Sequence, residues 1–228
     1  KGTLTVEAMV IDSGNVKVTL ERDTYDGSAI GYTVSIGGVT VQANDRLVIT
    51  INGSRDTEIL NAGDYEFAIN GDGEYYQGNV NITVTVKQAD ISVMGFGLNK
   101  TSATYTGSVI EVKANTDIAV SLAVTQDGKE AQLINAGTYT VTVTPTDPNY
   151  TGSKEFTFTI DKAPHKAPVQ TELTIEVAWN SVTVTHDEFT VQLSKDGNDW
   201  VDTTMGGYDA NSSYALHVRF KEDANHSA

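Results

Sequence analysis

The chain has 228 residues, 39% of them hydrophobic, and its 15 Lys and Arg against 30 Asp and Glu give a formal net charge of −15. This acidic balance argues against nucleic acid and membrane surfaces as partners, because both are negatively charged. The absence of cysteine excludes disulfides, zinc–thiolate sites, iron–sulfur clusters and cysteine nucleophiles. No apolar run approaches the roughly 18 residues of a membrane helix, so we expect no membrane insertion. A start at Lys1 resembles neither an initiator Met nor a signal peptide, so we expect an excised or processed segment.

Apolar residues alternate with Thr or charged residues along most of the chain, which predicts β-strands. The rows before residue 164 are Tyr65-Phe67-Ile69, Val80-Ile82-Val84-Val86, Ile118-Val120-Leu122-Val124, Tyr139-Val141-Val143 and Phe156-Phe158-Ile160. Later rows are Leu173-Ile175-Val177, Val182-Val184, Phe189-Val191-Leu193 and Tyr214-Leu216-Val218-Phe220. Turn pairs such as Asn52-Gly53 and Asp127-Gly128 separate the rows and favour tight hairpins. We therefore predict an all-β chain of antiparallel sandwiches.

The first 163 residues contain the same landmarks twice. Tyr25-Asp26-Gly27 recurs 80 residues later as Tyr105-Thr106-Gly107. Asn61-Ala62-Gly63-Asp64-Tyr65 recurs as Asn135-Ala136-Gly137-Thr138-Tyr139, and Tyr76-Gln77-Gly78 as Tyr150-Thr151-Gly152, both at an offset of 74. The difference, 80 − 74 = 6, places six extra residues between Ile30 and Glu58. We predict two tandem homologous domains, the first repeat at 1–88 and the second repeat at 89–163.

A compositionally different third segment follows, at 164–228. The stretch 161–168 has two prolines and no periodicity, which indicates a short, stiffened linker. All four histidines and both tryptophans lie beyond residue 163. Phe189 to Trp200 is predicted to form a hairpin that turns at 195–198. Trp179, on an early strand, is predicted to lie at the centre of a small two-sheet core.

Tyrosines at the strand starts have a predicted structural role. Tyr139 comes directly after Asn135-Ala136-Gly137, so it can bury its ring and return its hydroxyl to nearby backbone, as in the tyrosine corner of sandwiches. Tyr65 and Tyr214 are candidates for the same role. Tyr76 and Tyr150 are predicted to cap the core where the chain turns into its last strand.

On these residues the two repeats resemble the immunoglobulin-like repeats of bacterial surface proteins called MBG or YDG repeats. The shared pattern is Tyr-Asp/Thr-Gly, then Asn-Ala-Gly-x-Tyr, then Tyr-x-Gly before a Phe-x-Phe-x-Ile strand. The longer middle of the first repeat, from Val39 to Asp56, departs from that pattern. The third segment is similar to a fibronectin-III-like repeat of cell-wall proteins of Gram-positive gut bacteria, from Phe189 through Trp200 and Tyr214 to Ala228. The resemblance implies three sandwiches in line that act as spacers or adhesion modules.

Chemical motifs give little. Among the motifs for serine nucleophiles, phosphate loops and paired metal-binding histidines, none is found, so we expect no enzyme and no cofactor. His186-Asp187-Glu188 is interpreted as a polar turn. Calcium is a weak candidate at Asp196, Asn198 and Asp199, because the Asp-Gly hairpin explains the same residues. A self-formed Lys–Asn or Lys–Asp isopeptide bond suits the setting but needs a buried Lys, which the alternation disfavours.

The main hypothesis is a non-enzymatic, monomeric, semi-rigid spacer in a secreted or cell-wall-attached bacterial surface protein, with neighbouring domains of the longer protein as its partners. Two alternatives remain open. One is an adhesin module that binds host glycan or protein through Tyr76, Tyr208 or the long loop of the first repeat. The other is an accessory part of a larger extracellular hydrolase.

Overall fold

A computed structural model describes residues 2, 3, 5, 7–209 and 211–228. The described chain is almost entirely strand and turn, with two short 3-10 helices, η1 (Ile91–Val93) and η2 (Gln170–Glu172). Neither is long or apolar enough to cross a membrane. The chain divides into two compact units: unit 1 is Lys1–Phe96, Thr116–Ser121 and Val143–Lys154, and unit 2 is Gly97–Asn115, Leu122–Thr142 and Glu155–Ala228. The all-β prediction is confirmed, and the three domains at 1–88, 89–163 and 164–228 stay a prediction.

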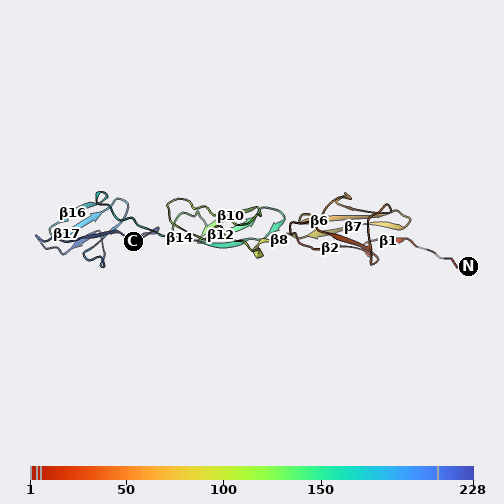
Figure 1. The fold of residues 1–228 in the computed structure, drawn as a ribbon, viewed down its shortest axis with the longest axis horizontal. Helices are drawn as coiled ribbons and strands as arrows, with labels where there is room; N and C mark the ends of the chain where they lie inside the picture. Colours follow the sequence, from red (N-terminus) through yellow and green to blue (C-terminus); the bar gives the residue numbers. More distant parts are fainter. Residues whose placement is uncertain (1, 4, 6, 210) are drawn as a thin grey trace. The chain divides into compact units, whose positions relative to one another are not determined.

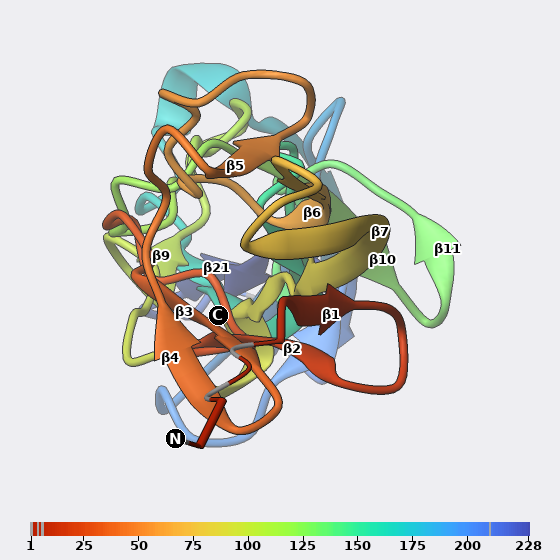
Figure 2. The same ribbon diagram turned by 90° about the vertical axis from the view of Figure 1, so that its right-hand side faces the viewer.

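Unit 1 contains two facing sheets and a short two-stranded one. The first sheet has the order β1-β7-β6-β5, with β1 Met9–Ile11, β5 Leu47–Ile51, β6 Gly63–Gly71 and β7 Tyr76–Val86. The second has the order β2-β3-β4, with β2 Val16–Leu20, β3 Tyr32–Ile36 and β4 Val39–Val41. The short one pairs β8 (Ala89–Asp90) with β13 (Tyr150–Thr151). Figure 1 shows β6 and β7 side by side above β2, and Figure 2 shows β5 and β6 apart from β3 and β4.

The core of unit 1 follows from the alternation of its strands. Side chains of β6 point alternately to opposite faces, so Tyr65, Phe67 and Ile69 are buried while their neighbours are half-buried or exposed. They pack with Val34 and Ile36 of the other sheet in one apolar cluster. Two sheets that each present an apolar row to the other form a sandwich core.

The six extra residues of the first repeat lie in its middle strands. The Ile30 amide donates to the Ile59 carbonyl, and the Ile110 amide donates to the Leu133 carbonyl in the same way. The first pair is 59 − 30 = 29 residues apart and the second 133 − 110 = 23, which gives the same difference of six. In the first repeat this stretch holds the β3–β4 hairpin and a loop at 42–46 that leads into β5.

Unit 2 holds most of a five-stranded sheet and three smaller sheets. The five-stranded sheet has the order β11-β10-β12-β14-β9, with β9 Ser102–Thr104, β10 Val120–Gln126, β11 Lys129–Glu130, β12 Gly137–Pro145 and β14 Lys154–Asp161. The others have the orders β16-β17-β20, β19-β18-β21 and β15-β22. Their strands are β15 Ala163–Pro164, β16 Thr174–Ala178, β17 Ser181–Thr185, β18 Val191–Ser194, β19 Val201–Asp202, β20 Thr204–Gly206, β21 His217–Phe220 and β22 His226–Ser227.

The core of the third segment differs from the sequence prediction. It consists of Val184, Val191, Leu193, Met205 and Phe220. Trp179 was expected at its centre, and that prediction is wrong, because the residue is 88% exposed. The register pairs Ala178 with Ser181, so Trp179 and Asn180 form the two-residue turn between β16 and β17. A side chain at the tip of a hairpin points to solvent instead of between the sheets.

Replacing Phe67 by Ala tests the core of unit 1. Phe67 is fully buried and meets the Tyr32 ring in a T-shaped contact, with 4.9 Å between centroids. We expect a loss of about 3–5 kcal/mol in the free energy of unfolding, because the deletion leaves a cavity. Urea unfolding measures it. The control is Val93→Ala, at a side chain 84% exposed, where a change within about 0.5 kcal/mol is expected; equal losses in both variants would contradict the assigned core.

Candidate functional site at the repeat junctions

A loop of the first repeat is joined to a turn of the second by side-chain amides within unit 1. The backbone amide of Ala62 donates to Asn149 Oδ1 at 2.8 Å, and Asn149 Nδ2 donates to Asn61 Oδ1 at 3.2 Å. Asn149 is held for this by Asp147, whose Oδ1 accepts from the Asn149 amide at 2.9 Å. We call this set of contacts the first junction.

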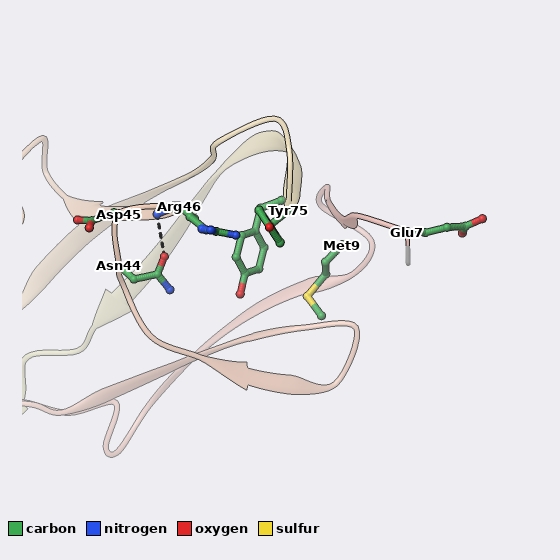
Figure 3. Close-up of a pocket in the computed structure, with 7 residues that line it drawn as sticks. Glu7, Met9, Asn44, Asp45, Arg46 and Tyr75 are labelled. Atoms are coloured by element: carbon green, nitrogen blue, oxygen red, sulfur yellow. Dashed lines mark hydrogen bonds between the residues drawn. The ribbon is translucent and has the colours of Figure 1, made fainter. Parts of the chain in front are cut away.

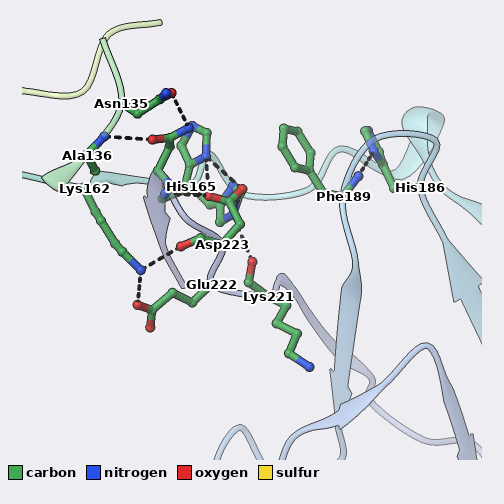
Figure 4. A network of polar contacts seen from close by, with 11 residues as sticks. Asn135, Ala136, Lys162, His165, His186, Phe189, Lys221, Glu222 and Asp223 are labelled. Carbon is green, nitrogen blue, oxygen red and sulfur yellow. Dashed lines mark hydrogen bonds and ion pairs between the residues drawn. The ribbon is translucent and has the colours of Figure 1, made fainter. Parts of the chain in front are cut away.

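The same contacts recur within unit 2. The Ala136 amide donates to Asn225 Oδ1 at 2.8 Å, and Asn225 Nδ2 donates to Asn135 Oδ1 at 3.2 Å. Asp223 Oδ1 accepts from the Asn225 amide at 2.7 Å, as Asp147 does for Asn149. Figure 4 shows this second junction. The third segment therefore provides the same Asp-x-Asn turn as the second repeat.

A parallel backbone bridge accompanies each junction. Ala89 pairs with Tyr150 in β8–β13, and Ala163 pairs with His226 in β15–β22. The amide of Ala89 donates to the Asn149 carbonyl at 3.0 Å, and that of Ala163 donates to the Asn225 carbonyl at the same distance. At both junctions, therefore, the strand that follows one repeat pairs with the residues directly after the Asp-x-Asn turn.

The glycine of each Tyr-x-Gly motif lies beside a parallel strand pairing, β1–β7 for Gly78 and β8–β13 for Gly152. β1 pairs in parallel with β7, so the backbone of Ile11 crosses directly over Gly78. Gly78 has φ 103°, and a Cβ there would lie 2.6 Å from the Ile11 carbonyl oxygen. Gly152 has φ 80°, and a Cβ there would meet the side-chain carboxylate of Asp90 instead of backbone. The left-handed backbone favours glycine at both positions, and the crossing backbone of Ile11 requires it at Gly78 as well.

Tyrosines fix the loops that the junctions use. The Tyr65 hydroxyl donates to the Asn61 carbonyl at 2.9 Å, and the Tyr139 hydroxyl donates to the Asn135 carbonyl at 2.8 Å. Both rings are buried, so each loop is anchored to a core. Tyr214 of the third segment was expected to bury its ring in the same role, and that prediction is wrong, because the residue is 43% exposed; its hydroxyl donates to Asp209 Oδ2 at 3.1 Å.

A pair of aromatic rings packs at each junction in addition to the hydrogen bonds. Tyr25 and Tyr150 meet edge to face with centroids 5.3 Å apart, and burial raises the pKa of the Tyr150 hydroxyl. Tyr105 and His226 meet in the same geometry at 5.1 Å. Tyr25 and Tyr105 come from the Tyr-Asp/Thr-Gly motif, whose Gly27 and Gly107 have positive φ. All three sequence motifs of the repeats therefore contribute to the junctions.

A third parallel strand pair, β1–β7 near the N-terminal end, has no Asn contact of this kind among the described residues. Tyr75 stands where the second repeat has Asn149, one residue before the Tyr-x-Gly motif. The Arg46 guanidinium lies 3.5 Å from the centre of the Tyr75 ring, and a hydrogen bond to Tyr75 raises the Arg46 pKa, against a smaller effect of desolvation. Figure 3 shows Arg46, Asn44 and Tyr75 around a pocket of about 490 Å³. Arg46 and Asn44 belong to the long middle of the first repeat.

The remaining predicted residues are placed as follows. Tyr76 is half-buried and packs against the core of unit 1. Trp200 is half-buried beneath Arg219, whose guanidinium carbon is 4.1 Å from the ring centre. His186 Nδ1 accepts from the amides of Glu188 and Phe189, as expected of a polar turn. The sequence did not predict that Asn149 and Asn225 bind the Asn-Ala loops, although Asp-Pro-Asn-Tyr and Asp-Ala-Asn-His, 76 residues apart, carry the signal.

The weak calcium candidates Asp196, Asn198 and Asp199 form hydrogen bonds with one another within the hairpin turn. Asp196 Oδ1 accepts from the amides of Asn198 and Asp199 at 2.8 and 3.1 Å and from the Ser194 hydroxyl at 2.9 Å. The hydrogen bonds from Asn198, then Asp199 and Ser194, lower the Asp196 pKa to about 2. The turn thus accounts for the carboxylate without an ion.

Comparisons with known proteins identify a family over part of the chain. Residues 96–164 match a family model described as the MBG domain. No curated protein matches the chain. A crystal structure of the FN1–FN3 domains of chicken CNTN1 is similar at 11% identity and a TM-score of 0.26, covering 93% of this chain and 94% of that chain. An MBG domain in an all-β chain is typical of modules of extracellular surface proteins, which are generally not catalytic.

The lowered pKa of Asp196 predicts a pH dependence of stability. Its folded value of about 2 lies below the ordinary 3.8, so the stabilisation is present above about pH 4 and is lost as the pH falls toward 2. Asp196→Asn removes this pH-dependent stabilisation. The urea midpoint of the variant therefore falls less than that of the wild type between pH 4 and 2. Asp187→Asn, at an exposed acid, controls for the charge. Parallel curves for wild type and Asp196→Asn would contradict the assignment.

Proposed function

We propose that the chain is a non-enzymatic spacer segment of a secreted or wall-attached surface protein, in which the junctions limit bending between successive repeats. The observation that carries this proposal is the recurrence of one set of contacts at two places. In each, an Asn side chain binds the Asn-Ala loop that comes earlier in the chain. A parallel strand pair lies beside it, and two aromatic rings meet edge to face. A flexible linker needs none of these.

The energy of a junction supports a stiff connection. Each has two hydrogen bonds through the Asn side chain and further backbone bonds in the bridge. A hydrogen bond contributes about 0.5–1.5 kcal/mol, so losing three together costs roughly 3 kcal/mol. Since 1.4 kcal/mol corresponds to a factor of ten, open states would be populated at roughly 1%.

Composition and sequence pattern support the setting. A chain without cysteine cannot stiffen its joints by disulfides, so packing and hydrogen bonds gain weight, and a net charge of −15 favours a soluble, monomeric segment. We extend the MBG assignment of residues 96–164 to the first repeat, because the same three motifs recur there. In this proposal the third segment is a fibronectin-III-like module, the parent is a Gram-positive surface protein, and the partners are its neighbouring domains.

Replacing Asn149 by Ala tests the first junction. The variant loses both side-chain hydrogen bonds and leaves the Ala62 amide without this acceptor. Because the chain has no cysteine, spin labels at Thr19→Cys and Ser153→Cys report only the distance across this junction. Double electron–electron resonance measures that distance. We expect a narrow distance distribution in the spin-labelled protein with Asn149 and a clearly broader one in the same protein with Asn149→Ala.

The matched control is Asn79→Ala, at an exposed position on β7. It should leave the distribution narrow. An already broad distribution in the parent, or no change in Asn149→Ala, would refute the stiff junction. Small-angle X-ray scattering of the wild type tests the spacer itself, since a compact globule would be incompatible with it.

The adhesin alternative is favoured by one feature of the third segment. Trp179 and Val177 are 88% and 81% exposed and line a pocket of about 350 Å³ with Tyr208 and Tyr214. Asp209, Asn211 and Ser212 add polar groups at its rim. An aromatic ring with polar neighbours is the chemistry that binds the apolar face of a sugar ring. Tyr208 itself is half-buried, beneath Lys195 at 4.4 Å.

Tryptophan fluorescence separates the two functions. Trp179 and Trp200 are the two tryptophans, so Trp200→Phe leaves Trp179 as the reporter. The variant should emit like indole in water and be quenched readily by acrylamide, because Trp179 is exposed. A saccharide bound at this pocket would shift the emission at millimolar concentration. We expect no shift if the chain is a spacer; a saturable shift that Trp179→Ala abolishes in the wild-type background would support the adhesin.

A further inference from the structure

The two junctions share their hydrogen bonds but differ at two side chains. His226 occupies the place of Tyr150, since both pair with the first residue of the parallel bridge. His165 occupies the place of Ile91, two residues beyond Ala163 as Ile91 is beyond Ala89. Asp223 keeps the role of Asp147. The second junction therefore has two imidazoles beside a carboxylate where the first has an apolar residue and a tyrosine.

These three side chains converge. His226 Nδ1 lies 3.0 Å from Asp223 Oδ2, and His165 Nε2 lies 3.6 Å from the same oxygen. Each of the three residues offers one ligand atom, an imidazole nitrogen or a carboxylate oxygen, and these three atoms all lie within 4.8 Å of one another. The side chains of His165, His226 and Asp223 are 6%, 23% and 39% exposed. Figure 4 shows His165 and Asp223 in this network.

The spacing suits a small divalent ion. Zinc bonds of about 2.0–2.1 Å in a tetrahedral site put neighbouring ligand atoms about 3.3 Å apart. The separations of 3.0 and 3.6 Å bracket that value. The Lys221 carbonyl oxygen lies 3.0 Å from His165 Nε2 and could complete the set, and a cavity of about 280 Å³ adjoins both imidazoles. Water or this carbonyl is available as the fourth ligand.

We propose that His165, Asp223 and His226 form a site for a divalent transition metal ion, with Zn²⁺ as the test ion, that fastens the second junction. Two imidazoles and one carboxylate suit zinc and disfavour calcium, which prefers oxygen ligands. The rings stack with centroids 4.5 Å apart and planes 23° from parallel. Because the metal must lie in the plane of each ring, the more exposed His226 turns as it binds.

The surroundings hold one imidazole in place and set the local charge. The His165 ring meets Phe189 and Phe220 at centroid distances of 5.0 and 5.4 Å, so it is held by packing. Lys162 Nζ pairs with Glu222 beside the cluster, and Lys166 lines the cavity. These two cations weaken the attraction for a metal ion but do not occupy its ligands.

Metal binding would connect two chain segments far apart in sequence. His165 follows β15, whereas Asp223 and His226 flank the turn that carries Asn225. An ion shared by these residues adds a crosslink parallel to the β15–β22 bridge. Because it binds the folded state, it raises the thermal midpoint by roughly 10 °C at a hundredfold excess over Kd. This inference does not rest on the spacer proposal, since its readout is the metal itself.

Isothermal titration of ZnCl₂ into the untagged protein tests the site. We expect one ion per chain, with ¹⁵N resonances of His165 and His226 shifting while those of His186 and His217 stay. The variant His165→Ile with His226→Tyr gives the second junction the side chains of the first, which pack there already. Its affinity should fall by at least about a hundredfold. His217→Gln, at an exposed histidine, is the matched control and should bind like the wild type.

Asp223→Asn provides a second variant that keeps the turn, because an amide oxygen still accepts from the Asn225 and His226 amides. It should weaken zinc binding by about tenfold or more. The proposal is wrong if the wild type binds no zinc, if its two histidine resonances do not move, or if the double variant binds as tightly as the wild type.

Discussion

The backbone amide at the end of each Asn-Ala loop is the constraint on which the arrangement of the repeats depends. A backbone N–H turned away from its own sheet has to find an acceptor, because an unpaired buried donor costs as much as a lost hydrogen bond. Ala62 and Ala136 both find it in an Asn side chain supplied by the following part of the chain. The loop and the turn are therefore each incomplete alone.

The fold was largely predictable because its signal is local. Alternation along β6 and β12 identified the buried residues Phe67, Ile69 and Val141 correctly, since the pleat alone decides which face a side chain occupies. The internal repeat also located the longer middle of the first copy. Trp179 was misjudged because a shift of the hairpin by one residue decides between core and turn tip, and that register depends on pairing with β17.

The junctions were not predictable in the same way. Asn61 and Asn149 are 88 residues apart, and the separation of Asn135 and Asn225 is 90, so no periodicity joins them. The motif glycines were visible in the sequence, but only the parallel pairing explains their surroundings: the backbone of Ile11 crosses Gly78, and the Asp90 side chain lies against Gly152. The cluster of His165, Asp223 and His226 was missed for the same reason: its members come from two segments that the β15–β22 pairing brings together.

The contacts that the Asn149 and Asn225 side chains make with the Asn-Ala loops are between neutral groups, and this sets them apart from the ion pairs of the surface. A pair such as Lys87 and Asp23, with side chains 67% and 63% exposed, weakens as ionic strength rises, because mobile ions screen it. The amide contacts of Asn149 and Asn225 carry no net charge for mobile ions to screen. The strength of these amide contacts should therefore be the same in dilute and in saline solution.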